Sequence, residues 1–322
     1  MTEKLIIDAD TGIGDALAIA MALADPELDV VALTAVGGAV SAVDAGRNLQ
    51  ALIEALDPPK WPRIGQAEAS QRLAEVESVP PSPEWQTQQR LLSGPHGLGD
   101  WPVAVADLHH PREAAKLMTE LARDYPDEIT LLTLGPLTNV ALAADRDSGF
   151  LGRLRSLVCL GGTITAEGDV TPSAEFNMFH HPEAARLVLK SPALKTIVPR
   201  DSSHKTMLSF DQLDRLGLTT ATHCGGLLGQ LLPFSLRAHR QHLGVEGIWL
   251  PELTALATIA RPQLFKRMTM AVDVETDGHL TRGMTVFDRR QHRVWQNNVD
   301  AVIDVDPQGV IDYFTQMLRR AM

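Results

Sequence analysis

The stretch Leu5-Ile-Ile-Asp8-Ala-Asp10-Thr-Gly12-Ile-Gly14-Asp15-Ala-Leu-Ala18 indicates how the chain is built. Residues 5–7 are apolar and typical of a buried β-strand, and the apolar residues 16–24 predict a helix that ends at Asp25-Pro26. Gly12 and Gly14 allow a tight turn between the two elements. We therefore expect a strand, a turn and a helix in immediate succession.

Three carboxylates gather around this turn. Side chains of a strand alternate between its faces, so Asp8 and Asp10 point the same way, and Asp15 sits at the start of the helix. This is the edge of a sheet where α/β proteins bind ligands. Crowded carboxylates raise one another's pKa unless a cation neutralises them. Three of them within eight residues favour a divalent metal ion, with Ca²⁺ preferred over Mg²⁺ if carbonyls and a bidentate carboxylate take part.

A plainer interpretation stays open at this point. Asp15 would cap the helix, and Asp8 and Asp10 would be solvated turn residues without a ligand.

The same alternation of strand and helix continues along the chain. Apolar runs predict further strands at residues 28–35, 129–134, 157–160, 196–198 and 268–276. Helices are predicted at residues 42–56, from 138, over most of 208–260, and at 307–321. Near-continuous apolar strands separated by helices indicate an α/β fold with a mostly parallel central sheet and helices on both faces.

We expect a single domain over residues 1–322, because no linker, repeat or low-complexity segment divides the chain. Residues 78–100 contain four prolines and three glycines, which predict a long loop. Loops of that length in compact domains are typical of lids and binding loops.

Charge and composition exclude several classes of function. The chain has 29 Lys and Arg against 40 Asp and Glu, a net charge of −11, which disfavours binding to nucleic acid. The apolar stretch near the N-terminus is too short for a signal peptide, and nothing in the sequence approaches a membrane span. We expect a cytoplasmic protein whose partner is a small molecule.

Several motifs, taken in order, resemble one known family. The stretch at Asp8 is similar to the signature Asp-x-Asp-Pro-Gly-x-Asp-Asp-Ala of the inosine–uridine nucleoside hydrolases. Further segments with counterparts in that family are Thr133–Asn139, Leu160–Gly162, Gly168–Asn177, Pro182–Ala185, Asp201–His204 and Thr281–Thr285. Each motif is weak alone. Their order and spacing, from about residue 4 to residue 305, identify the chain as a divergent member.

This resemblance implies the nucleoside-hydrolase fold, which is Rossmann-like, and cleavage of the N-glycosidic bond of a nucleoside or related N-riboside. In that family a Ca²⁺ at the bottom of the pocket binds two ribose hydroxyls and the attacking water. Carried over, the ligands would be Asp10, Asp15, the Leu134 carbonyl and Glu252, which stands where the family has an aspartate. Asp10 would also take the proton of the water, and Asp8 would support the ligands from behind.

The resemblance also implies which residues contact the substrate. Glu175 and Asn177 would hold ribose hydroxyls, and Asp169, which replaces an asparagine of the family, would lie beside them. Without the matched motif, Glu175 and Asn177 would instead be interpreted as a polar strand end satisfied by backbone groups. Members of the family usually form dimers or tetramers, so we expect a homodimer or homotetramer.

Four positions depart from the family pattern. They are Gly14 and Ala39, which replace an aspartate and an asparagine, and Ser93 and Pro251, which replace histidines. Each lost hydrogen bond to a substrate hydroxyl costs ~1–3 kcal/mol, so ordinary ribonucleosides are expected to turn over slowly. Our hypothesis is that the small residues at 14 and 39 open space for a differently substituted sugar.

The sequence offers five histidines as the acid that protonates the leaving base: His180, His181, His204, His239 and His242. His239 and His242 are candidates because their helix and the loop after it border the pocket of the family. Trp249 can stack on a base or pack in the core.

The sequence leaves two other functions open. The lost recognition residues allow a non-catalytic relative that binds a metal ion and a sugar. Asp8-x-Asp10-x-Gly12 after a strand also resembles the signature of haloacid-dehalogenase-like phosphatases. Those enzymes need a paired-aspartate motif that the sequence lacks, so the phosphatase is the weaker alternative.

Overall fold

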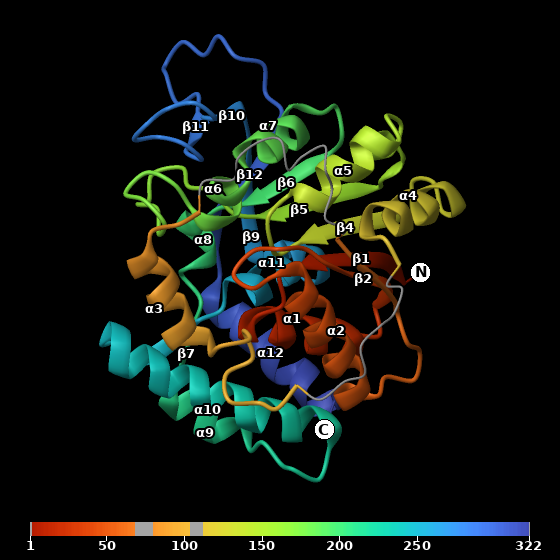
Figure 1. Ribbon diagram of the computed structural model, residues 1–322, viewed down its shortest axis with the longest axis vertical. Helices are drawn as coiled ribbons and strands as arrows, with labels where there is room; N and C mark the ends of the chain where they lie inside the picture. Colours follow the sequence, from red (N-terminus) through yellow and green to blue (C-terminus); the bar gives the residue numbers. More distant parts are fainter. Residues whose placement is uncertain (1, 68–79, 104–111, 322) are drawn as a thin grey trace.

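A computed structural model describes residues 2–67, 80–103 and 112–321 of the chain. Its centre is an eight-stranded sheet in which every neighbouring pair is parallel except the last (Figure 1). In spatial order the strands are β3 (Arg63–Gln66), β2 (Leu28–Ala35), β1 (Glu3–Ala9), β4 (Ile129–Thr133), β5 (Ser156–Leu160), β6 (Lys195–Val198), β12 (Val299–Val305) and the antiparallel β9 (Phe265–Met270).

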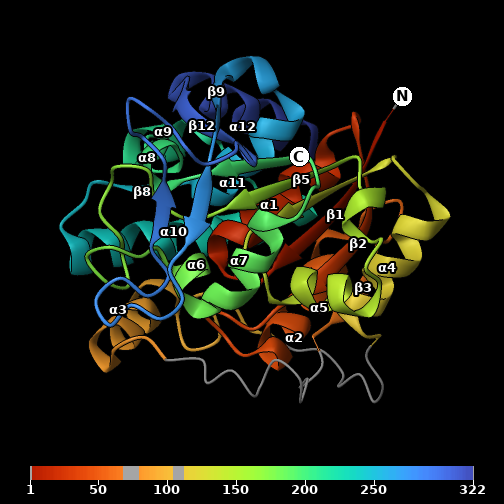
Figure 2. The same cartoon turned by 90° about the horizontal axis from the view of Figure 1, so that it is seen from above.

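Helices cover both faces of this sheet (Figure 2). One face carries α1 (Ile13–Ala24), α2 (Ala42–Leu56), α10 (His223–Leu243), α11 (Pro251–Ala260) and α12 (Pro307–Ala321). The other carries α4 (Ala114–Asp124), α5 (Thr138–Arg146) and α7 (Pro182–Lys190). The predicted fold class, α/β with a mostly parallel sheet, is confirmed.

The sequence of β1 explains why it lies near the middle of the sheet. Leu5 and Ile7 belong to the buried cluster on one face and Ile6 to the cluster on the other. All three side chains are fully buried, because consecutive apolar residues in a strand fill both sides of the sheet. The strand therefore delivers the residues that follow it to the carboxyl edge of the sheet.

Smaller elements surround this frame. They are the hairpin of β10 (Val272–Val274) and β11 (Thr285–Phe287), the pair β7 (Met207–Ser209) and β8 (Gly247–Trp249), the helices α3 (Pro83–Ser93), α6 (Phe176–His180), α8 (Arg200–Ser203) and α9 (Phe210–Leu216), and the short 3₁₀ turns at Leu151–Arg153 and Pro262–Leu264.

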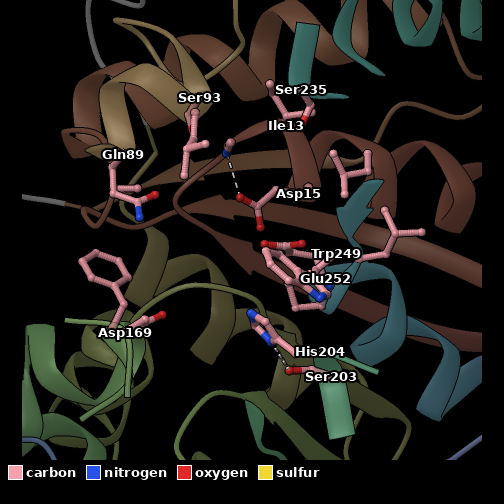
Figure 3. A pocket seen from close by; sticks show the side chains of 18 of the residues that line it. Ile13, Asp15, Gln89, Ser93, Asp169, Ser203, His204, Ser235, Trp249 and Glu252 are labelled. Atoms are coloured by element: carbon pink, nitrogen blue, oxygen red, sulfur yellow. Dashed lines mark hydrogen bonds between the residues drawn. The ribbon is translucent and has the colours of Figure 1, made fainter. Parts of the chain in front are cut away.

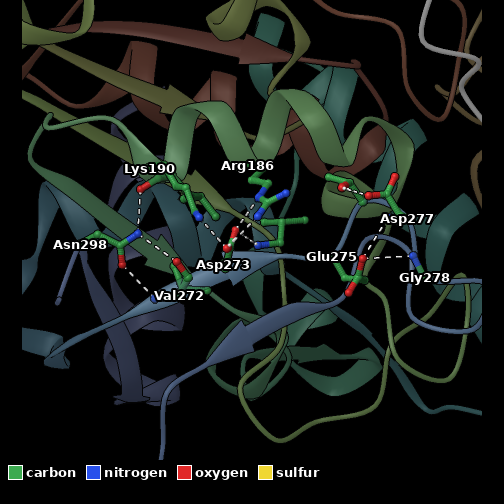
Figure 4. A network of polar contacts seen from close by, with 11 residues as sticks. Arg186, Lys190, Val272, Asp273, Glu275, Asp277, Gly278 and Asn298 are labelled. Carbon is green, nitrogen blue, oxygen red and sulfur yellow. Dashed lines mark hydrogen bonds and ion pairs between the residues drawn. The ribbon is translucent and has the colours of Figure 1, made fainter. Parts of the chain in front are cut away.

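Charged side chains of α7 fasten the β10–β11 hairpin to the body of the protein (Figure 4). Asp273 lies 2.9 Å from Nε of Arg186 and 2.6 Å from Nζ of Lys190. Beside it, the Asn298 amide exchanges hydrogen bonds with both backbone groups of Val272. The charged groups here are therefore paired with opposite charges, and the Asn298 amide is paired with backbone groups.

Three sequence expectations about elements are wrong. Within the described part of the predicted loop 78–100, residues 83–93 form α3, because Ser82 caps the helix and Pro83 occupies its first position. The predicted strand 268–276 is split, since the chain leaves the central sheet at Ala271. The helical region 208–260 is interrupted by β8.

Candidate active site

A cavity of about 560 Å³ opens at the carboxyl ends of β1, β4 and β5 (Figure 3). Its floor is formed by residues that directly follow these strands and by the first turns of α1 and α11. Its upper walls come from α3, α8, α10 and β8. The lining includes Asp10, Asp15, Leu134, Asp169, Glu175, Asn177 and Glu252, which are the residues that the sequence assigned to the site apart from Asp8.

Three carboxylates occupy the floor. Oδ2 of Asp10 accepts a hydrogen bond of 2.6 Å from the Ala39 backbone N–H, and Oδ2 of Asp15 accepts one of 2.7 Å from the Gly12 N–H. Burial raises the pKa of Asp10, and burial together with the charges of Asp10 and Glu252 raises the pKa of Asp15. Burial likewise raises the pKa of Glu252 to about 7. The floor therefore resists full ionisation unless a cation joins it.

Asp8 lies behind this floor and does not line the cavity. Its Oδ1 accepts hydrogen bonds from Oγ1 of Thr34 at 2.6 Å and from Nδ2 of Asn139 at 2.8 Å. Burial raises the pKa of this carboxyl to about 7. Asp8 therefore contacts the protein core, whereas Asp10 lines the cavity.

The chemistry of the floor suits a hard cation, because its side chains offer only oxygen. Oδ1 of Asp15 and Oδ2 of Asp8 are buried and have no hydrogen-bond partner within the described residues, which is costly for a carboxylate. In the same part of the chain, however, no three acidic, histidine or cysteine side chains stand close enough to hold a metal ion as they are. A cation would have to draw the carboxylates together.

Asn177 is engaged with the backbone beside this floor. Its Nδ2 donates to the Leu134 carbonyl at 2.8 Å and to the Leu160 carbonyl at 3.1 Å. Both hydrogens of the amide are therefore used by the backbone. The Leu134 carbonyl keeps a second lone pair for another partner.

Glu175 acts as the N-cap of α6. Its carboxylate accepts hydrogen bonds from the backbone N–H groups of Gly162, Asn177 and Met178, at 2.8, 3.1 and 3.3 Å. Burial and the charge of Asp169 nevertheless raise the pKa of Glu175 to about 8. The backbone contacts that the plainer interpretation of the sequence foresaw are present, although the side chain also lines the cavity.

A polar chain that the sequence analysis missed runs along one wall. Arg200 lies 3.5 Å from Oδ2 of Asp169 and donates to Nε2 of His204 at 2.9 Å. Since a guanidinium only donates, Nε2 of His204 is unprotonated and its Nδ1–H donates to Oγ of Ser203. Burial and Arg200 lower the pKa of His204 to about 3. Both nitrogens of His204 are occupied.

The upper end of the cavity is aromatic. The Trp249 ring lies near two imidazoles, with its ring centroid 5.7 Å from that of His204 and 6.1 Å from that of His239. Nδ1–H of His239 donates to the Ser235 carbonyl at 2.9 Å, and Nε2 has no hydrogen-bond partner among the residues that the structure describes. His242, the other histidine suggested by the sequence, does not line the cavity.

Helix α3 closes the wall opposite Trp249. Trp85 stacks on Phe176, with centroids 4.7 Å apart and ring planes inclined by 16°. Gln88, Gln89 and Ser93 of the same helix also line the cavity. Because this helix was predicted as a loop, only Ser93 was singled out. The Ser82-Pro83 pair was the available signal for a helix start.

The four departures from the family pattern all line the cavity or contact its floor. The hypothesis that Gly14 opens space is wrong: a Cβ built on Gly14 overlaps Oε2 of Glu252 and lies 2.8 Å from Oε1. The side-chain space of Gly14 is filled by a carboxylate. Ala39 lines the cavity, Ser93 ends α3, and Pro251 is the first residue of α11.

Comparison with known proteins agrees with this architecture. The profile of the inosine-uridine preferring nucleoside hydrolase family matches residues 5–312. The chain belongs to this family. It is 35% identical to uridine nucleosidase 1 of Arabidopsis thaliana, over 99% of this chain and 94% of that one. It is 30% identical to the pyrimidine-specific ribonucleoside hydrolase RihA of Shigella flexneri, over 99% of both chains.

A solved plant nucleoside hydrolase has the same fold, with a TM-score of 0.87 and 28% identity over 99% of both chains. The protein is thus a nucleoside hydrolase, and the phosphatase and the non-catalytic binder are set aside. No helix in residues 2–67, 80–103 and 112–321 is long and apolar enough to cross a membrane.

Proposed function

We propose that this hydrolase cleaves pyrimidine nucleosides, uridine first among them, into free base and sugar with the help of a Ca²⁺ held on the acidic floor. The proposal depends chiefly on one observation: at the bottom of the cavity Asp10 and Asp15 are buried and Glu252 is half-buried beside them, without a basic side chain of the described residues paired to them. The names of the two relatives described above, which are 35% and 30% identical to this chain, support the pyrimidine base.

Asp10 is the proposed general base. Its carboxylate follows β1 directly, is held by the Ala39 N–H, and faces the cavity. When bound, the cation would lower the pKa of a water molecule and fix sugar hydroxyls. Asp10 can then remove the proton from the attacking water, and the carboxylates around the sugar stabilise the positive charge that develops at its anomeric carbon.

Asp10, Asp15, Glu252 and the Leu134 carbonyl would hold the cation, and Asp8 would keep its neighbours in place from the core. At the sugar, Oδ1 of Asn177 is the atom that we expect to contact a hydroxyl. Glu175 contributes more through the cap of α6 than through a free oxygen, because three backbone N–H groups already use its carboxylate. Asp169, held by Arg200, is proposed to contact the outer part of the sugar.

The departing base is proposed to lie among Trp249, His239 and the amide side chains of α3. His239 presents Nε2 there, whereas His204 has both nitrogens engaged. We therefore assign the contact with the leaving base to His239 rather than His242.

The test uses the full chain, freed of metal by chelation and reloaded with Ca²⁺. Release of base is measured with uridine, cytidine, inosine, 2′-deoxyuridine and an equal concentration of ribose as blank. The proposal expects uridine turnover that disappears with chelator and returns with Ca²⁺. Turnover that persists in chelator would refute the role of the cation. A preference for inosine would refute the assignment of a pyrimidine base.

The family resemblance also leads us to propose a cytoplasmic homodimer or homotetramer made of single-domain chains. Light scattering measures the assembly. A single cooperative unfolding transition is the result expected of one domain.

A further inference from the structure

Gly14 and Glu252 share one space at the floor of the cavity. Gly14 is the second residue of α1, and Glu252 is the second residue of α11. A Cβ on Gly14 would collide with the far end of the Glu252 side chain, against Oε1, Oε2 and Cδ. The carboxylate therefore lies directly over the bare Cα of the glycine, next to Asp15.

The other glycine of this turn behaves differently. A Cβ on Gly12 would lie 3.7 Å from Oδ2 of Asp15 and 3.7 Å from the Gly97 carbonyl, which are ordinary van der Waals contacts. The need for glycine at position 14 thus comes from Glu252 and not from the turn. No positive φ forces it either, because Gly14 lies in the regular helix α1.

A side chain at position 14 would have one easy way to escape the collision. The atoms it meets are the end of a flexible glutamate and not backbone, so the carboxylate would swing away while α1 stays in place. The cost would fall on the arrangement of the carboxylates and little on folding.

We propose that Gly14 is a positioning residue: its missing side chain lets the carboxylate of Glu252 cross from α11 onto the first turn of α1, beside Asp15, where the two acids together bind a divalent cation. The inference rests on the proposed function for the identity of the ligand. It adds that positions 14 and 252 are a coupled pair, with a long acid on one helix and no side chain on the other.

The experiment compares Gly14→Ala with Gly229→Ala. Gly229 is also in a helix, α10, and a Cβ there meets nothing within 4 Å, so it controls for the general effect of alanine on a helix. Ca²⁺ affinity is measured by titration calorimetry, and the melting temperature is measured in chelator. We expect Gly14→Ala to weaken Ca²⁺ binding about 10–100-fold, as loss of ligand positioning does, with no fall in the melting temperature of the cation-free protein.

A rescue variant separates positioning from mere packing. Glu252→Asp shortens the acid by one methylene and clears the new Cβ, so Gly14→Ala/Glu252→Asp is expected to bind Ca²⁺ more tightly than Gly14→Ala alone. Glu252→Asp by itself leaves the glycine uncovered and is expected to bind more weakly than the unchanged protein.

Two results would overturn the proposal. One is Ca²⁺ affinity in Gly14→Ala equal to that of Gly229→Ala. The other is a cation-free melting temperature lowered only in Gly14→Ala, which would make the glycine a packing requirement of α1. If the unchanged protein binds no Ca²⁺, the proposed cation fails, and crystals of cation-free Gly14→Ala decide the inference separately. A displaced Glu252 side chain supports it, and a displaced α1 backbone refutes it.

Discussion

Two groups of acidic side chains in this protein have opposite surroundings. At the β10–β11 hairpin, Asp273 sits between Arg186 and Lys190 (Figure 4), and these contacts hold its pKa below the ordinary value although burial alone would raise it. At the cavity floor, burial raises the pKa of Asp15 and Glu252, and the neighbouring acids Asp10 and Glu252 add to the effect at Asp15 (Figure 3).

The difference shows which acids the protein itself neutralises. An ion pair such as that of Asp273 is complete and fastens one segment to another. Buried acids that repel one another cost folding free energy, and such a cost is commonly kept where a ligand removes it. Arg200, the basic side chain in the cavity wall, is held by Asp169 and His204 and so serves the wall and not the floor.

The largest expected effect comes from removing a carboxylate of the floor. Asp10→Asn keeps an oxygen for the Ala39 N–H but cannot take a proton. We expect kcat for uridine to fall by about 10²–10⁴-fold, the range for loss of a general base, with the melting temperature retained. Asp273→Asn makes the same chemical change at the hairpin and serves as the control. Its kcat should equal that of the unchanged protein. An unchanged kcat in Asp10→Asn would remove Asp10 from the reaction.

The second expected effect is a dependence of stability on pH that Ca²⁺ weakens. Asp8 and Glu252 have pKa values raised to about 7 and Glu175 to about 8, against ordinary values near ~4 in the unfolded chain. Between these limits the folded state binds more protons than the unfolded state, so the free energy of unfolding falls as pH rises.

The melting temperature of the cation-free protein should therefore drop steadily between about pH 5 and pH 8. With Ca²⁺ present the drop should be smaller, because the ion binds the ionised floor and stabilises the folded state by mass action. NaCl at matched ionic strength serves as the control. Identical pH profiles with Ca²⁺ and with NaCl would contradict the view that the floor awaits a cation.

Much of the fold could be predicted because strands and helices of this type leave strong local signals. The strands β1, β2, β4, β5 and β6 are short apolar runs, and α1 follows the Gly-rich turn as predicted, although it begins at Ile13 and not at residue 16. The edge strand β3 is four residues long and only one of its residues is buried, so it lacks such a run. Helix α3 has no buried residue at all, and its prolines suggested a loop.

For the site, the order of several motifs along the chain predicted more than any single motif did. The family resemblance assigned Asp10, Leu134 and Asn177 to one site, and all three line the cavity at the carboxyl edge of the sheet. The Arg200–His204 contact and the crossing of Glu252 over Gly14 could not be predicted. They depend on how α8, α11 and α1 pack in space, and no local sequence pattern determines that packing.

A third prediction carries the comparison of paired and unpaired groups to the upper end of the cavity. His239 has a free Nε2, whereas both nitrogens of His204 are used. Only the imidazolium form of His239 carries a proton on Nε2 for the departing base, and burial lowers the pKa of this histidine. We therefore expect His239→Gln to lower kcat for uridine by about 10²-fold, most strongly at acidic pH, while kcat for a p-nitrophenyl riboside, whose leaving group needs no proton, changes little. His204→Gln should not separate the two substrates. Equal losses on both substrates in His239→Gln would make His239 a structural residue.

The smallest effect is expected at the paired acid itself. Asp273→Asn removes the charge that Arg186 and Lys190 contact, but the hairpin keeps the hydrogen bonds of Asn298 with Val272. Partly exposed ion pairs contribute little, so we expect a loss of about 0.5–1 kcal/mol in the free energy of unfolding, measured by urea denaturation. A lowered pKa stabilises the folded state fully above the ordinary pKa of the acid, and the gain is lost as pH falls through the lowered pKa of the folded state, so this loss should vanish at a pH well below the ordinary 3.8. A loss that stays constant down to that pH would mean that packing, and not charge, holds the hairpin. Asp273 would then not be an acid that the protein neutralises, and its contrast with the acids of the cavity floor would fail.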